Sequence, residues 1–89
     1  MTGLPFDESL SSKGVRIRTF QRDTDPEELV WHRDVEDRQV SIIAAEGWYL
    51  QLDEQLPVEL TPGDSHFIPR GMWHRVISRG SSNLIVEIR

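Results

Sequence analysis

Apolar and polar residues alternate with a period of two in several short stretches of this chain. In the segment 14–20, Val15 and Ile17 alternate with Arg16 and Arg18. This period is typical of a β-strand with one buried face. The apolar run at 40–45 contains β-branched residues, which favour a strand over a helix. The same patterns predict about eight short strands, at residues 14–20, 27–34, 40–45, 48–52, 58–60, 65–68, 73–78 and 84–89.

Turn-forming residues separate the predicted strands. Residues 23–26 combine Asp, Thr and Pro, and residues 61–64 add Gly to these types, which favour tight turns. Residues 69–71 predict a tip that joins strands 65–68 and 73–78 into a β-hairpin. No long window has helical spacing, and no segment repeats with a period of 20–50 residues. The sequence therefore predicts an all-β fold, either a barrel or a double-sheet jelly roll.

The length of 89 residues is that of a single domain. Residues 1–12 are polar, contain Pro5 and show no clear period, so we expect an N-terminal tail there. Residues 13–89 contain all the predicted strands and form the expected barrel domain.

Composition and charge narrow the compartment and the partners. The chain has no cysteine, which excludes disulfides, zinc ribbons and thiol catalysis. Its net charge of −5 argues against a nucleic-acid partner. No apolar run approaches the roughly 18 residues of a membrane span, so no membrane partner is expected. Residues 1–10 lack the pattern of a signal peptide, and we expect a cytoplasmic protein.

The segment 63–78 carries the most specific motif of the chain. Gly63, Pro69, Gly71 and His74 are spaced as in the second cupin motif, and Ser78 stands where the family usually has Asn. Glycine at the entry turn permits a positive φ, and the strand after the tip brings the histidine into the barrel. On these residues the chain resembles small single-domain cupins of the cupin-2 type.

A second segment resembles the first cupin motif in part. His32 matches the first histidine of that motif, whereas Asp34, Arg38 and Ala45 replace its second His, its Glu and its Gly. The resemblance covers about residues 13–89. It implies the cupin double-stranded β-helix, or jelly-roll, barrel, which is often dimeric and in many members holds a divalent metal. We therefore expect a homodimer.

Two interpretations of the barrel lumen remain open. His32 and Asp34 are two residues apart and share a strand face, so with His74 they would form the two-His-one-carboxylate set that suits Fe, Mn, Ni or Zn. Arg38 opposes this interpretation, because a guanidinium has no lone pair and repels a dication. An Asp34–Arg38 ion pair would then close the site.

The function that we predict is binding of a small anionic molecule in the lumen, without a tightly bound metal. Arg38, His32 and His74 are its candidate ligand-binding residues, because arginine binds carboxylates bidentately. His66 either widens this site or is a hydrogen-bonded core histidine. The alternative function is a metal-dependent cupin enzyme, of oxygenase or isomerase type, with metal ligands His32, Asp34 and His74.

Two further points concern where the aromatic residues lie. Trp31, Trp48 and Trp73 are expected to pack in the core or at a dimer interface. Tyr49 and Gln51 share one face of their predicted strand, and the sequence leaves open whether that face lines the lumen.

Overall fold

The computed structural model describes residues 5–80 and 82–89. Within them, a three-residue 3-10 helix, η1, precedes β3, and the remaining elements are strands. These are β1 (Asp7–Leu10), β2 (Arg16–Phe20), η1 (Pro26–Glu28), β3 (Arg38–Ala44), β4 (Trp48–Leu52), β5 (Val58–Glu59), β6 (Ser65–Ile68), β7 (His74–Ser78) and β8 (Leu84–Ile88). None of the described residues belongs to a helix with the length and apolar character that crossing a bilayer requires.

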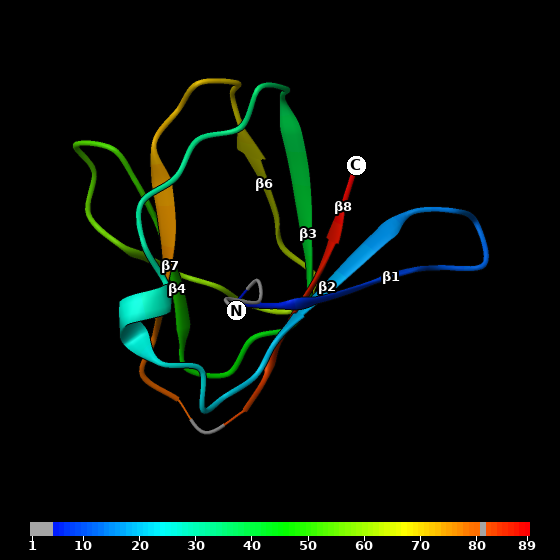
Figure 1. Cartoon of the computed structure of the whole chain (residues 1–89), viewed down its shortest axis with the longest axis horizontal. Coiled ribbons are helices and arrows are strands. Elements are labelled where there is room, and N and C mark those ends of the chain that lie inside the picture. The colour runs from blue at the N-terminus through cyan, green and yellow to red at the C-terminus, as the bar shows by residue number, and fades with distance from the viewer. Residues whose placement is uncertain (1–4, 81) are drawn as a thin grey trace.

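The strands form two antiparallel sheets. The larger has the order β1-β2-β8-β3-β6 and the smaller has the order β5-β4-β7. The connections β3–β4, β5–β6, β6–β7 and β7–β8 each cross from one sheet to the other, so the chain winds around a common interior. Figure 1 shows β4 and β7 on one side of the molecule and β3, β6 and β8 on the other. The predicted all-β jelly-roll barrel is confirmed.

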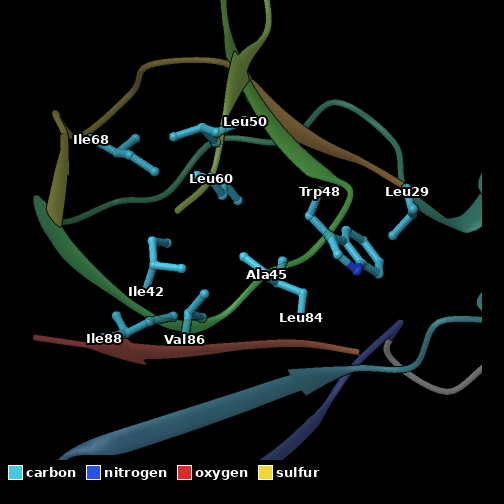
Figure 2. Packing of buried hydrophobic residues seen from close by; sticks show 10 residues of the cluster. All are labelled: Leu29, Ile42, Ala45, Trp48, Leu50, Leu60, Ile68, Leu84, Val86 and Ile88. Atoms are coloured by element: carbon cyan, nitrogen blue, oxygen red, sulfur yellow. The ribbon is translucent and has the colours of Figure 1, made fainter. Parts of the chain in front are cut away.

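Side chains from both sheets fill the space between them, as Figure 2 shows. Trp48 and Leu84 have no exposed surface, and the Trp48 indole Nε1–H donates to the Ser82 carbonyl over 2.8 Å. The buried core consists of Leu29, Ile42, Ala45, Trp48, Leu50, Leu60, Ile68, Leu84, Val86 and Ile88.

The strand expected at 27–34 is wrong. Pro26–Glu28 form η1 instead, and within 27–34 only His32 makes a β-bridge. The Asp25 carboxylate accepts a hydrogen bond from the Glu27 N–H over 2.9 Å, and Pro26 occupies the first turn of the helix. A capping acid followed by proline favours a helical turn, and this local chemistry outweighs the alternation of side chains.

The hairpin expected at 65–78 is also wrong. The turn between β6 and β7 is present, with Gly71 at a φ of 77°, and Gly63 has a φ of 94° in the turn before β6. However, β6 pairs with β3 and β7 pairs with β4, in different sheets. The turn at 69–71 therefore spans the edge of the barrel and delivers His74 to the opposite wall.

The expected tail at residues 1–12 contains a strand. Residues 1–4 lie outside the described residues, but β1 pairs with β2 along its whole length. All four residues of β1 are exposed, so this edge strand lies on the barrel surface.

Candidate functional site

His32 and His74 meet across a single β-bridge at the edge of the smaller sheet. The His32 N–H donates to the His74 carbonyl over 3.0 Å, and the His74 N–H donates to the His32 carbonyl over 2.9 Å. Their imidazole rings lie 4.1 Å apart, edge to face. His74 begins β7 and is buried, whereas His32 is exposed at the rim. The bridge therefore places two imidazoles together at the barrel mouth.

Both imidazoles are oriented by backbone carbonyls. The Nδ1 of His74 lies 2.8 Å from the Met72 carbonyl, and the Nδ1 of His32 lies 3.3 Å from the Val30 carbonyl. A carbonyl only accepts, so each Nδ1 carries the hydrogen, and each Nε2 of a neutral ring keeps a free lone pair. Metal-binding histidines are oriented in this way by a hydrogen bond from their second nitrogen.

Asp34 completes a cluster of three possible ligands. Its Oδ2 lies 3.5 Å from the Nε2 of His74, and one ligand atom from each of His32, Asp34 and His74 lies within 4.8 Å of the others. Ligands bound at about 2.1 Å to one tetrahedral ion are about 3.4 Å apart. Separations of up to 4.8 Å would therefore have to shorten by up to about 1.4 Å for the cluster to hold an ion.

Burial keeps His74 neutral. Loss of solvation lowers the pKa of His74 below its ordinary value of 6.5, although the hydrogen bond to Met72 and the charge of Asp34 act in the opposite direction. A neutral imidazole is the form that ligates a metal, so His74 stays available as a ligand below pH 6.5.

The segment 34–38, which ends at the first residue of β3, is tied to the β6–β7 turn. The Gly71 N–H donates to the Asp34 carbonyl over 2.8 Å, and the Arg70 N–H donates to the Asp37 carboxylate over 2.9 Å. These two bonds hold the 34–38 segment against the motif that delivers His74. Asp34 and Arg38 consequently face the same opening as the two histidines.

The expected Asp34–Arg38 ion pair is present but loose. The Nε of Arg38 lies 4.0 Å from the Oδ2 of Asp34, and a terminal nitrogen lies 3.9 Å from the Glu36 carboxylate. The side chain of Arg38 is 13% exposed. Its Nε is buried and has no hydrogen-bond partner among the described residues. A guanidinium that is buried without full hydrogen bonding is open to a further acceptor.

His66 lies apart from this cluster. It lines a different cavity, of about 140 Å³, with Leu50, Leu52, Val58 and Phe67 among its neighbours. His66 and Ile68 are two apart on β6 and share a face, but only Ile68 lines the inner cavity. The structure therefore does not bring His66 into contact with the cavity that His32 and His74 line.

One face of β4 lines the lumen. Trp48 and Leu50 are buried, and Leu50 borders the inner cavity described below, whereas Tyr49 lies outside it and meets Arg79. The expectation of core packing holds for Trp48.

Trp31 and Trp73 are 37% and 41% exposed, so a role for them at a dimer interface stays a prediction. Each of them meets an arginine across the bridge. Arg75 lies 4.8 Å from the Trp31 ring and Arg33 lies 5.1 Å from the Trp73 ring. Such cation–π contacts, on either side of His32 and His74, help to hold residues 31–33 against β7.

Two cavities meet at the cluster. The inner cavity, of about 70 Å³, extends into the apolar core, and the outer cavity, of about 360 Å³, lies on the side of Phe6 and Leu29. The residues that border both cavities are Arg18, Phe20, His32, Asp34 and Val76. Arg18 is not among the site residues predicted from the sequence, where its only signal is its place in the alternating segment 14–20.

Solved structures with the same fold are cupin proteins. A cupin domain from Bordetella pertussis Tohama I is 23% identical, with 100% of this chain and 96% of that chain covered and a TM-score of 0.61. A cupin-2 domain protein from Shewanella frigidimarina is 14% identical, with coverage of 100% and 82% and a TM-score of 0.66. The fold is therefore that of the cupins.

Larger enzymes share the fold as well. Fe(II) HppE, solved in complex with its substrate, is 8% identical with a TM-score of 0.67, and the match covers 100% of this chain and 55% of HppE. The chain thus spans about half the length of that enzyme. No protein-family model and no curated protein matches the sequence.

Proposed function

We propose that this protein binds a divalent metal ion through the Nε2 atoms of His32 and His74 and the carboxylate of Asp34, and that a small molecule binds beside the ion. The observation that carries the proposal is the orientation of the two imidazoles. The Nδ1 of each ring lies against a backbone carbonyl, the Nε2 of His74 lies 3.5 Å from the Asp34 carboxylate, and one ligand nitrogen of His32 lies within 4.8 Å of both. Two imidazoles and one carboxylate are the donor set of non-haem Fe(II) sites.

The residues present fit a dication in donor type. As ligands, two imidazoles are neutral and a carboxylate carries one negative charge, and each offers a lone pair, whereas the positive charge of Arg38 beside Asp34 opposes the ion. A bound ion would act as a Lewis acid on a substrate oxygen, because three protein ligands leave coordination positions open. The fold of Fe(II) HppE supports the proposal, since that enzyme shows that a cupin barrel of this kind accommodates iron and a substrate.

A metal-free anion site is the second candidate function. The observation that favours it is the buried Nε of Arg38, which lacks a hydrogen-bond partner among the described residues. A carboxylate placed against this nitrogen would satisfy it. The ion pair with Asp34 opposes this function, because it already neutralises much of the charge of Arg38.

Titration calorimetry with Mn²⁺, Fe²⁺, Ni²⁺ and Zn²⁺ separates the two functions, with protein that carries no histidine tag. The variants are His74→Ala, which removes a ligand, and His66→Ala, which removes a histidine outside the cluster. The metal proposal predicts saturable binding of at least one ion to wild type and to His66→Ala, and its loss in His74→Ala. Binding that survives in His74→Ala, or its absence in folded wild type, would overturn the proposal.

We also propose that two copies of the chain associate through the outer face of the larger sheet. Ile43 on β3 and Phe67 on β6 are 47% and 54% exposed there. These neighbouring strands present apolar surface whose burial would be favourable. The proposal is tested by the mass measurement given in the Discussion.

A further inference from the structure

The strand β2 places its charged residues toward the barrel interior. Arg16 and Arg18 lie directly opposite Ile88 and Val86 of β8. Residues that lie opposite each other in an antiparallel pair project to the same face. Because Ile88 and Val86 are buried, the two arginines share the inner face and Ile17 takes the outer one. Phe20 on this face packs against the core, but the two arginines occupy positions where core packing alone would select apolar residues.

A reversed strand of this kind points to a role other than packing. The side chain of Arg18 is only 18% exposed, which is uncommon for a guanidinium with one ion-pair partner among the described residues. Positions where a charged residue faces the interior against the usual pattern are often functional. Arg18 also borders both the inner and the outer cavity.

Arg18 has one ion-pair partner among the described residues, Glu8. The Nε of Arg18 donates to one oxygen of Glu8 over 2.7 Å, and the guanidinium lies 4.3 Å from the centre of the Phe6 ring. Glu8 belongs to the edge strand β1, whose four residues are all exposed. Glu8 is held by the Nε of the guanidinium, so a ligand can approach the terminal nitrogens without displacing Glu8. A guanidinium has five N–H donors, and this bond uses one of them.

The outer cavity around Arg18 has mostly apolar walls. Phe6, Phe20, Leu29, Val30 and Val76 line it, and its volume of about 360 Å³ is that of a small-molecule site. Besides Arg18, the charged residues that line it in the described part of the chain are Glu28 and Asp34, both acidic. These two acids repel anions, so the arginine can offset at most one negative charge on a ligand, and the two charges of a phosphate ester are disfavoured.

We propose that Arg18 is the anion-recognition residue of this site and binds the carboxylate of a small apolar or aromatic monocarboxylate in the outer cavity. The apolar body of the ligand lies against Phe6 and Phe20, and its far end reaches His32 and Asp34. Only the contact of that far end with His32 and Asp34 rests on the proposed function. Binding of the carboxylate itself requires no metal.

NMR titration of the metal-free protein in EDTA tests this inference, with phenylacetate as the probe. Phenylacetamide serves as its neutral counterpart and benzyl phosphate as a dianionic one. Arg18→Gln should weaken phenylacetate binding about 10-fold or more, because charge-assisted hydrogen bonds are lost. Arg16→Gln is the matched control, since Arg16 lies on the same face of β2 but lines neither cavity. Glu8→Gln should strengthen binding about threefold by releasing Arg18.

The outcomes separate this inference from the metal proposal. Support consists of phenylacetate binding more tightly than both other probes, with the expected order of the variants. Equal binding of phenylacetate and phenylacetamide, tighter binding of benzyl phosphate, or no saturable phenylacetate binding by folded wild type up to about 10 mM would overturn the inference. If Arg18→Gln does not fold, an unchanged affinity in Glu8→Gln overturns it instead. The metal proposal is untouched by these results, because it is judged by metal titrations of the histidine variants.

Discussion

Replacing Arg38 by glutamine tests how charge controls the metal site. The substitution keeps a polar side chain of similar reach and removes one positive charge beside Asp34. Since the Nε of Arg38 lies 4.0 Å from the Oδ2 of Asp34, an ion about 2 Å from that oxygen is at most about 6 Å from the Nε. At an effective dielectric constant of about 20, repulsion between one positive charge and a dication at this distance amounts to about 6 kcal/mol.

The measured gain should be smaller than this repulsion, because solvent screens a site at the barrel mouth and Asp34 loses the partner that orients it. We expect Arg38→Gln to bind divalent ions about 10- to 1000-fold more tightly than wild type, which corresponds to about 1.4–4 kcal/mol. Titration calorimetry with Mn²⁺ and Zn²⁺ measures the change. Arg79→Gln is the matched control, because Arg79 contacts Tyr49 and lines neither cavity at the site.

The same variant should change anion binding in the opposite direction. If the site holds a small anion without a metal, removing the charge of Arg38 weakens that binding instead. An Arg38→Gln protein that retains the wild-type circular dichroism spectrum but binds metal no better than Arg79→Gln would refute the electrostatic reasoning.

Three further predictions concern stability and assembly. In EDTA, the free energy of unfolding should fall as pH drops below 6.5, because the pKa of His74 is lowered in the folded protein and the unfolded chain therefore binds more protons. Denaturant titrations at about pH 7.5 and 5.5 should show a smaller decrease for His74→Ala than for wild type. Trp48→Phe should lower the free energy of unfolding by about 1–3 kcal/mol, because it removes the hydrogen bond to Ser82 and leaves a void; an unchanged urea midpoint would contradict this. Light scattering should return about twice the chain mass of 10.3 kDa, and a double Ile43→Ser, Phe67→Ser variant should return the monomer mass; a monomeric wild type at all concentrations would end the dimer proposal.

Local sequence chemistry was enough to predict the half of the site that contains His74. Gly63 and Gly71 adopt positive φ values in the turns that flank β6, and these turns are set by residues close in the sequence. Asp34 and Arg38 were expected to form an ion pair, and they do. These features depend on residues that are a few positions apart, and such spacings can be read from the sequence.

The errors concern partners that are distant in the sequence. A turn at 69–71 predicts a hairpin, but pairing of β6 with β3 and of β7 with β4 is decided by how the whole chain wraps its core.

The error at His32 has a local cause. The alternation predicts a continuous strand there, whereas a capped helical turn and one β-bridge position the residue. The sequence contained the capping signal at Asp25 and Pro26, which competes with alternation over so short a segment.

Arg18 was missed for a different physical reason. A period of two separates the faces of a strand but does not say which face is buried when each carries both large apolar and polar residues. Phe20 shares the inner face of β2 with Arg18, while Ile17 lies on the outer face. Only the register with β8 identifies the inner face, and that register depends on residues more than sixty positions away.

The central claim is that two specific imidazole nitrogens bind a divalent ion, and long-range ¹H–¹⁵N NMR of the histidine rings tests it most directly. Before metal is added, the spectra of His32 and His74 should show a hydrogen on Nδ1 and none on Nε2. Addition of one equivalent of Zn²⁺ should shift the Nε2 resonances of both residues and leave those of His66 in place, because His66 lies outside the cluster. Unchanged His32 and His74 resonances, or a shift confined to His66, would contradict the account.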